Sequence, residues 1–143
     1  MDIRTLTDAY AVSPQITPED VDAIKAAGFT TIICNRPDAE VPPAFQAAAI
    51  GAVASAAGLA FVINPVIGGA LTMENVTAQA DAQAHSTGPV LAYCASGNRS
   101  SIVWALSQAG KASADDLISA GARWGYMLEG LRPQIEALAA RNA

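Results

Sequence analysis

One strand–loop–helix segment limits the folds open to this chain more than any other feature of its sequence. The apolar run 90–93 follows Gly88 and Pro89, and it predicts a buried strand. Cys94 ends the run, small and turn-forming residues follow, and an apolar pattern with helical spacing begins at Ile102. A loop in this position turns its backbone N–H groups inward at the positive end of the next helix. The segment therefore predicts an anion-binding site.

The chemistry of this loop centres on Cys94. The following helix and the guanidinium of Arg99 would both stabilise a thiolate at this position. An activated thiolate beside an anion site is typical of enzymes that attack phosphorus or sulfur. A buried, inert cysteine is the alternative, because free cysteines are among the most buried residues. The fixed spacing of Gly97, Arg99 and Ser100 after Cys94 favours a functional loop.

The residues around Cys94 receive supporting roles. The predicted anion-binding loop consists of Ala95, Ser96, Gly97 and Asn98. Gly97 would allow a positive φ or the close approach of a ligand. Ser100 is a candidate to donate its hydroxyl proton to the Cys94 thiolate, and a local hydrogen bond to the backbone is an equal alternative.

Helical and strand-like patterns alternate along the rest of the chain. Buried strands are expected at 29–34, 59–63 and 90–93, with an edge strand near 8–12. Helices are expected at 17–27, 44–57, 72–86, 113–120 and about 131–138, and a further helix has Ser100 in its first turn and includes the apolar run 102–106. The alternation predicts an α/β fold, a small parallel sheet with helices on both faces, in a single domain over residues 1–143. Ligands bind beyond the carboxyl ends of such strands, where Cys34, Asn64 and Cys94 fall.

Composition argues against several other classes of protein. A chain of 143 residues that is 52% apolar and 15% charged can bury a core and shows no signature of disorder. The formal net charge of −5 and the scattered basic residues argue against binding to nucleic acid or to an anionic membrane. No segment is long and apolar enough to span a membrane and no signal peptide pattern is present, so a cytoplasmic location is expected. Two cysteines and one histidine predict neither a disulfide scaffold nor a metal site, and no cofactor is expected.

Several motifs taken together resemble a known family. They are Gln15, Thr17-Pro18-Glu19-Asp20, Asn35-Arg36-Pro37-Asp38-Ala39-Glu40, Asn64-Pro65-Val66 and Cys94-Ala95-Ser96-Gly97-Asn98-Arg99-Ser100. The set resembles the phosphatase-like domain of beta-lactamase-hydrolase-like proteins, over nearly the whole chain. This resemblance implies a fold like the dual-specificity phosphatases, with Cys94 as nucleophile and Arg99 as anion clamp. Some relatives carry a fused metallo-beta-lactamase-like domain, whose His-x-His-x-Asp-His segment does not occur in this sequence.

Two departures from true phosphatases bear on the reaction. Phosphatases of this type have five residues between Cys and Arg, whereas four separate Cys94 from Arg99, a length that resembles the rhodanese sulfurtransferases. A smaller ring should suit a persulfide sulfur better than a phosphoryl group. The segment 64–69, where such phosphatases carry a general-acid Asp, contains no carboxylate. Loss of such an acid costs roughly 10²–10⁴-fold for an alkoxide leaving group, whereas a sulfur leaving group needs no proton.

Three residues of the loop after the strand 29–34 are candidate accessories. Asp38, or its neighbour Glu40, could replace the missing acid, although a solvated turn is the favoured alternative. Arg36 could add positive potential at the site, or could pair with one of these acids. Cys34 could form a disulfide with Cys94 or receive its sulfur, against the favoured alternative of a buried apolar cysteine.

The sequence therefore predicts a cysteine-thiolate enzyme that handles persulfide sulfur through Cys94. Its substrate would be a small anion of the persulfide or thiosulfate type. Hydrolysis of a phosphomonoester through a phosphocysteine intermediate is the alternative. A non-catalytic module that binds an anion or a partner is the second alternative, and the alanine-rich helices are compatible with a homo-oligomer.

Overall fold

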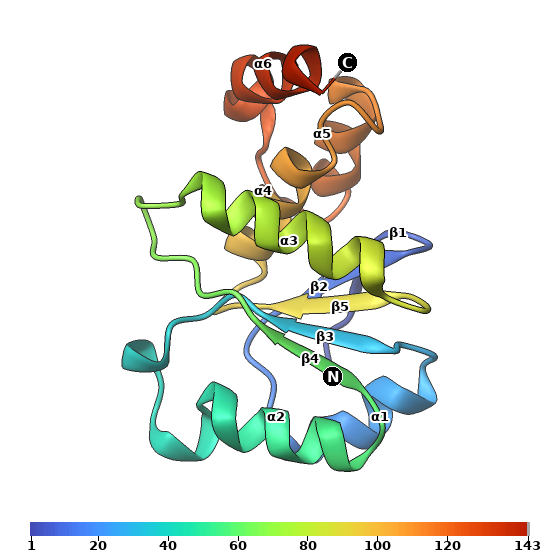
Figure 1. The fold of residues 1–143 in the computed structure, drawn as a ribbon, viewed down its shortest axis with the longest axis vertical. Coiled ribbons are helices and arrows are strands. Elements are labelled where there is room, and N and C mark those ends of the chain that lie inside the picture. The colour runs from blue at the N-terminus through green and yellow to red at the C-terminus, as the bar shows by residue number, and fades with distance from the viewer. Residues whose placement is uncertain (143) are drawn as a thin grey trace.

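The computed structural model describes residues 1–142 and contains a five-stranded sheet between two layers of helices (Figure 1). The strands are β1 (Arg4–Thr7), β2 (Tyr10–Ser13), β3 (Thr31–Cys34), β4 (Ala60–Ile63) and β5 (Val90–Tyr93). Their order in the sheet is β1-β2-β5-β3-β4. The last four strands in this order are parallel, while β1 pairs antiparallel with β2. The predicted α/β fold is confirmed.

Six α-helices surround the sheet. They are α1 (Val21–Ala26), α2 (Ala47–Ala56), α3 (Met73–His85), α4 (Asn98–Ser107), α5 (Ala114–Ala122) and α6 (Arg132–Arg141). Helices α1 and α2 cover one face, and the other four helices lie on the opposite side (Figure 1). No helix within residues 1–142 has the length and apolar character needed to cross a membrane.

Strand β5 lies in the middle of the sheet, and all four of its residues are buried. Its neighbours β2 and β3 run parallel to it and lead to α1 and α2 on one face of the sheet. Strand β5 itself leads to α4 on the other face (Figure 1). Open parallel sheets bind ligands at the carboxyl ends of strands where the connections of adjacent strands go to opposite faces of the sheet. Cys94 follows β5 directly and therefore occupies this position.

Two apolar clusters hold the helices against the sheet. Alternate residues of each strand point to opposite faces, so Ile33 and Ala92 pack toward α3 and α4, whereas Ile32 and Leu91 pack toward α1 and α2. Tyr10 stacks on Trp104 with ring centroids 5.6 Å apart, which fastens α4 to β2. The strands are short and apolar because both of their faces are covered.

Two strands differ from the sequence prediction. The strand expected at the edge near 8–12 is the inner strand β2, because β1 adds an antiparallel edge beyond it. The strand expected to be buried at 59–63 is β4, which forms the other edge and exposes Ala60 and Ile63. Apolar content alone does not distinguish an edge strand from a central one, because strand order depends on contacts between distant segments.

The helix starts follow the local signals closely. Thr72 accepts a hydrogen bond from the backbone of Asn75, and the Ser113 hydroxyl accepts one from the backbone of Asp116, so both helices begin where they were predicted. The helix expected from Ala44 instead begins at Ala47, after a separate 3-10 turn. The extended backbone before Ala47 interrupts the helical hydrogen bonds and sets this later start.

Candidate active site

The loop after β5 folds back on the sulfur of Cys94. Gly97 adopts φ 91°, and its N–H donates to Cys94 Sγ at 3.1 Å. Helix α4 begins at the next residue. Within residues 1–142, no acceptor is found for the backbone N–H groups of Ala95, Ser96, Arg99 and Ser100. These free amides at the start of a ten-residue helix form an anion cradle.

Two residues far away in the sequence fasten this loop from outside. The Tyr126 hydroxyl donates to the Ser96 carbonyl at 2.8 Å, and Arg4 Nη1 donates to the Tyr126 oxygen at 2.8 Å. A side chain at Gly97 would collide with the same Tyr126 hydroxyl, so the glycine is required by packing as well as by its positive φ. Burial raises the pKa of Tyr126, so its hydroxyl keeps its proton. Sequence reasoning missed Arg4 and Tyr126, since neither lies in a motif.

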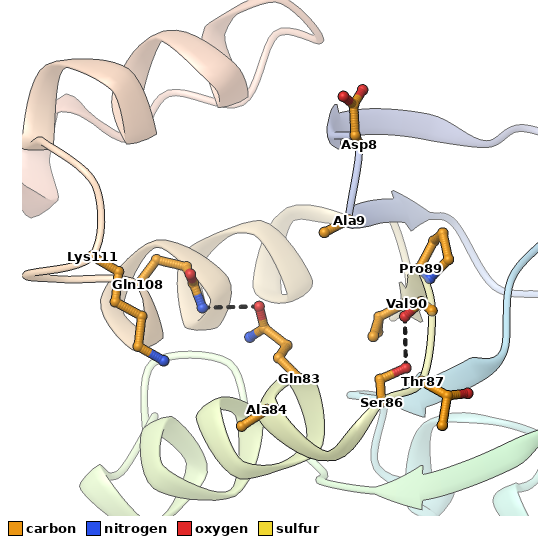
Figure 2. A pocket seen from close by; sticks show the side chains of 11 residues that line it. Asp8, Ala9, Gln83, Ala84, Ser86, Thr87, Pro89, Val90, Gln108 and Lys111 are labelled. Carbon is orange, nitrogen blue, oxygen red and sulfur yellow. Dashed lines mark hydrogen bonds between the residues drawn. The ribbon is translucent and has the colours of Figure 1, made fainter.

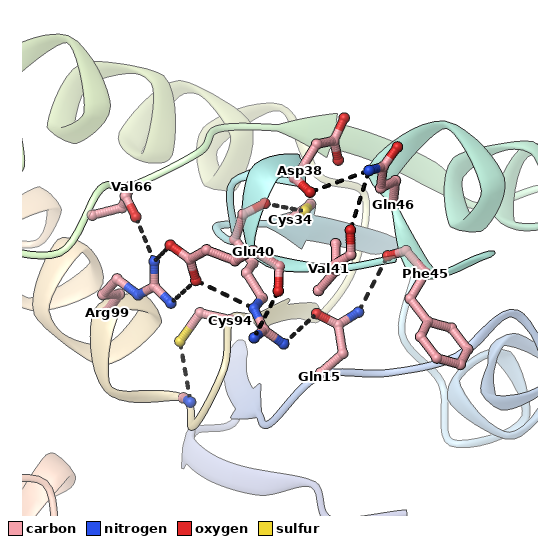
Figure 3. Close-up of polar contacts among 12 residues, drawn as sticks. Gln15, Cys34, Asp38, Glu40, Val41, Phe45, Gln46, Val66, Cys94 and Arg99 are labelled. Atoms are coloured by element: carbon pink, nitrogen blue, oxygen red, sulfur yellow. Dashed lines mark hydrogen bonds and ion pairs between the residues drawn. The ribbon is translucent and has the colours of Figure 1, made fainter. Parts of the chain in front are cut away.

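Arg99 carries the positive charge of the site. Its Nη1 and Nη2 donate to the two carboxylate oxygens of Glu40 at 2.8 and 2.7 Å, and Nη1 also donates to the Val66 carbonyl at 2.8 Å (Figure 3). The hydrogen bond to Glu40 is the main cause that raises the pKa of Arg99, and the nearby Cys94 adds to it. The same hydrogen bond holds the pKa of Glu40 below its ordinary value. Both groups are therefore charged at neutral pH.

A second arginine contacts the same carboxylate. Arg36 Nε lies 3.3 Å from Glu40 Oε1, and Arg36 Nη1 donates to Gln15 Oε1 at 3.3 Å. Gln15 is itself anchored, because its amide donates to the Ile16 carbonyl at 2.8 Å. Of the two roles open to Arg36, pairing with an acid is therefore the one that the contacts display. The partner is Glu40.

Asp38 and Cys34 lie near the site but do not bond to its central pair. Asp38 Oδ1 accepts from the Ala47 N–H at 2.9 Å, so this carboxylate caps α2. The Cys34 thiol donates to the Arg36 carbonyl at 3.3 Å and packs in the apolar layer of α1 and α2. Burial raises the pKa of Cys34, which keeps this thiol protonated. Neither side chain makes a hydrogen bond to Cys94 or Arg99 within the described residues.

A network of buried polar side chains lies beneath the site. Gln79 Oε1 accepts from the side-chain amides of Asn35 at 3.1 Å and Asn64 at 3.0 Å. Gln79 Nε2 donates to the Tyr10 hydroxyl, which donates to the Ser100 carbonyl at 2.8 Å. The network joins the carboxyl ends of β3 and β4 to the first turn of α4. It therefore fixes the floor of the site.

The hydroxyl of Ser100 is free for a role at the site. Ser100 is fully buried, and its Oγ has no hydrogen-bond partner in the part of the chain that the structure describes. A buried hydroxyl without a partner costs stability, so such groups are often kept for a ligand or a reaction. Of the two alternatives for Ser100, the local bond to the backbone is not formed.

Another cavity lies at the opposite end of the sheet (Figure 2). Its volume is about 490 Å³, and its lining includes Asp8, Gln83, Gln108 and Lys111. Pro89 and Val90 also line it, which places it at the amino end of β5, whereas Cys94 follows the carboxyl end. None of the site residues predicted from the sequence lines this cavity. Within residues 1–142, no group of three or more His, Cys, Asp or Glu side chains is arranged to hold a metal ion.

The fold and the loop together define a class of protein: an α/β domain with a Cys–Arg anion loop after its central strand, as in the dual-specificity phosphatases. Solved structures agree with this class. A candidate phosphatase of Neisseria meningitidis is 31% identical, with a TM-score of 0.80, and the match covers 96% of this chain and 99% of that one. PTPMT1, solved in complex with PI(5)P, is 14% identical with a TM-score of 0.77 and 99% coverage of both chains, which shows a shared fold.

The family model of the phosphatase-like domain of beta-lactamase hydrolase-like protein matches residues 2–111, and the chain belongs to this family. A beta-lactamase hydrolase-like protein of Xylella fastidiosa is 33% identical over 130 residues, which are 90% of this chain and 30% of that protein. Its counterpart in Agrobacterium fabrum is 29% identical over 125 residues, covering 86% of this chain and 29% of that protein. The chain thus spans under a third of the length of these relatives. The predicted family and the phosphatase-like fold are confirmed.

Proposed function

We propose that this chain is an enzyme in which Cys94 accepts a sulfur atom from a small anionic donor and passes it to a thiol. The observation that carries the proposal is a Cys–Arg anion loop of only four intervening residues, beside which Asp38 and Glu40 are both engaged in other bonds and not free to protonate a leaving group. Transfer of sulfur needs the nucleophile and the anion cradle but no such acid. The single domain over residues 1–143 and a reducing, cytoplasmic setting that keeps both thiols free are parts of the same proposal.

Thiosulfate illustrates the first step. The Cys94 thiolate attacks the outer sulfur, a new S–S bond forms, and the bond to the sulfonate group breaks with its electron pair leaving on sulfite. The free amides of the loop and the guanidinium of Arg99 would hold the oxygens of the donor. Sulfite leaves as a stable anion, so no proton is required. The product on the enzyme is a Cys94 persulfide.

In the second step, a thiolate acceptor attacks the outer sulfur of this persulfide. The acceptor leaves as a new persulfide, and Cys94 departs as the thiolate with which the cycle began. The free hydroxyl of Ser100 would stabilise that departing thiolate by donating to it. Atoms and charge balance without an external oxidant or reductant.

The two nearby carboxylates support this choice over ester hydrolysis. Asp38 is engaged as the cap of α2, at 2.9 Å from the Ala47 N–H. Glu40 is bound to Arg99, and that hydrogen bond lowers its pKa. An acid with a lowered pKa is ionised at neutral pH and cannot serve as the proton donor that an alkoxide leaving group requires.

Hydrolysis of a small phosphate ester is the second candidate, and the fold favours it. The family is named for its phosphatase-like domain, and the structural neighbours are phosphatases and candidate phosphatases. In this reaction Cys94 would attack phosphorus and form a phosphocysteine as the P–O bond to the alcohol or phenol breaks; water would then attack the phosphorus, release phosphate and restore the thiolate. Since no acid is poised, such activity would favour aryl phosphates, whose leaving groups need no proton.

Intact mass spectrometry separates the two candidates. After incubation with thiosulfate, we expect the wild-type chain to gain the mass of one sulfur atom, and an added thiol should remove it. Cys94→Ser should gain nothing, whereas Cys34→Ser should gain the same mass as the wild type. An unmodified Cys94, together with vanadate-sensitive turnover of an aryl phosphate, would establish the phosphatase instead.

A third measurement tests whether the domain is only a binding module. A reactive thiolate at Cys94 should be labelled by iodoacetamide near neutral pH faster than Cys34, whose pKa is raised by burial. Peptide mapping after a short exposure gives both rates. Equal, slow labelling of the two cysteines, together with no gain of sulfur from thiosulfate and no turnover of an aryl phosphate, would remove the enzymatic proposals and leave the module that binds an anion.

A further inference from the structure

The sulfur that the proposed reaction needs is covered in this structure. Cys94 has 0% of its surface exposed, although it lies at the carboxyl end of the central strand β5, where ligands bind in such sheets. Figure 3 shows Glu40 on Arg99 beside Cys94. Glu40 belongs to the loop after β3, so its carboxylate reaches the site from 59 positions away in the sequence. An anion that approaches Cys94 through the guanidinium must therefore meet Glu40 first.

Glu40 binds Arg99 with the paired geometry that a substrate anion could also use. The two carboxylate oxygens accept from the two terminal nitrogens of the guanidinium at 2.8 and 2.7 Å. A guanidinium holds two oxygens of a phosphate or a sulfonate in the same parallel arrangement. Glu40 thus occupies the pair of terminal nitrogens, one of the two donor pairs through which Arg99 could hold a substrate anion.

The surroundings of Glu40 allow it to leave. Its side chain is 35% exposed, whereas those of Arg99 and Arg36 are 16% and 20% exposed, so the carboxylate is the most accessible of the three groups. Arg36 already lies 3.3 Å from Glu40 Oε1 and is held in place by Gln15. If an anion takes Arg99, Arg36 remains as a partner for the displaced carboxylate.

We propose that Glu40 is a tethered competitor of the anionic substrate: it occupies Arg99 and covers Cys94 until an anion displaces it toward Arg36. This inference rests on the proposed function only in requiring that the substrate is an anion that reaches Cys94. It makes Glu40 a determinant of specificity, because only anions that bind a guanidinium better than a carboxylate gain access. Sulfonates and phosphates offer more oxygens to the free loop amides than Glu40 does.

Alkylation of Cys94 tests the competition without relying on turnover. Iodoacetate is an anion and iodoacetamide is its neutral counterpart. The ratio of their alkylation rates at Cys94 therefore reports how strongly the site attracts or repels a negatively charged reagent. We expect Glu40→Gln to raise the iodoacetate rate by about tenfold, the factor expected when one modest ion pair no longer has to be displaced. The iodoacetamide rate should rise by less than half that factor. Peptide mapping assigns the label to Cys94 rather than Cys34.

Glu19→Gln is the matched control. Glu19 is an exposed acid on the 3-10 turn before α1, and its replacement changes the net charge by the same amount. It should leave both rates unchanged, which separates a local effect from general electrostatic repulsion. A rise in the iodoacetate rate in this control equal to that of Glu40→Gln would overturn the proposal.

The opposite result would give Glu40 a different role. If Glu40 only orients Arg99 for substrate, its replacement should lower the iodoacetate rate rather than raise it. Unchanged rates with both reagents would mean that Glu40 does not cover Cys94. Either outcome rejects the competition, and neither rejects sulfur transfer, which the mass of the thiosulfate-treated chain decides separately.

The role of Arg36 has its own test. Arg36→Met should slow iodoacetate in the wild-type background, because the displaced carboxylate then lacks a partner. In the Glu40→Gln background the same substitution should have a much smaller effect on the iodoacetate rate, since there is no displaced carboxylate for Arg36 to bind. Equal effects in the two backgrounds would mean that Arg36 acts only through its positive potential.

Discussion

The two loops that meet at Arg99 are built in different ways. The loop after β5 is shaped by its own backbone, with Gly97 at φ 91° and its N–H on Cys94. The loop after β3, residues 35–46, contains two short 3-10 turns and is tied to the rest of the chain by side-chain bonds, such as the one that Asp38 accepts from the Ala47 N–H. Most residues from Asp38 to Ala44 are exposed, whereas Cys94 and Gly97 are buried.

The loop after β5 thus provides a rigid anion-binding site, whereas the loop after β3 carries a side chain that can move away from that site. Backbone amides that point at one position keep their arrangement when the ligand changes, which is what an anion site requires. A carboxylate on an exposed loop can rotate away at little cost, because water replaces its contacts. Changes to the loop after β5 should therefore affect catalysis and stability strongly. Changes to the loop after β3 should mainly affect access.

The largest effect is expected for Arg99→Lys. A lysine keeps the charge but loses the paired donors that hold Glu40 and would hold a substrate anion. We expect transfer from thiosulfate to fall by about 10²–10³-fold, the range found when one donor to a developing charge is removed. Arg123→Lys, which changes an arginine that donates to the Leu6 carbonyl in β1, should lower the transfer rate by less than about threefold. Similar losses in both variants would contradict a special role for Arg99.

Gly97→Ala should be the most damaging change to stability in the loop after β5. The positive φ costs about 1–2 kcal/mol for alanine, and the collision with Tyr126 adds about 1–3 kcal/mol. Gly28→Ala provides the matched comparison, because Gly28 has φ 99° but open space around it. Urea unfolding should give a clearly larger loss for Gly97→Ala than for Gly28→Ala. Equal losses would show that Tyr126 does not press on the loop.

Tyr126→Phe should weaken the outer support of the cradle without changing its chemistry. It removes the bond to the Ser96 carbonyl and the acceptor of Arg4, at about 0.5–1.5 kcal/mol for each hydrogen bond. Thiosulfate should then bind several-fold more weakly, which calorimetry can measure. Trp124→Phe loses a bond to the carbonyl of Thr5, which lies in β1 next to Arg4. This change should lower stability and leave thiosulfate binding unchanged.

The smallest effect is expected from the charge of Glu40 on stability. Its pKa is lowered in the folded chain, so the ion pair contributes fully above the unfolded value near 4.3 and is lost as the pH falls through the folded value. Because Glu40 is partly exposed, this contribution should be no more than about 1 kcal/mol. Urea unfolding of wild type and Glu40→Gln should differ by that amount at neutral pH and converge once the pH falls below the lowered pKa of Glu40 in the folded chain. A difference that persists at low pH would show that the carboxylate stabilises the fold by something other than its charge.

The sequence predicted the parts of the site that depend on neighbouring residues. Cys94, the turn at Gly97 and the helix that follows form one continuous segment, so the composition of that segment was enough to expect a cradle. Asp38 could be expected near the site, but its bond to the start of α2 could not, since a helix can begin at several adjacent positions. The free hydroxyl of Ser100 was one of two alternatives, and only the arrangement of the surrounding backbone distinguishes them.

By itself, the sequence determined the α/β class, the family and the position of the Cys–Arg loop. The fold class and the loop follow from apolar periodicity and turn residues, which act over a few positions of the chain, whereas the family follows from the resemblance of several motifs. The tertiary structure alone decided that β1 adds an antiparallel edge, that Arg4 and Tyr126 support the cradle, and that Glu40 occupies Arg99. The bond between Arg4 and Tyr126 joins residues 122 positions apart, and the bond between Glu40 and Arg99 joins residues 59 positions apart. They depend on strand order and on side-chain rotamers, which are settled only when the whole sheet is assembled.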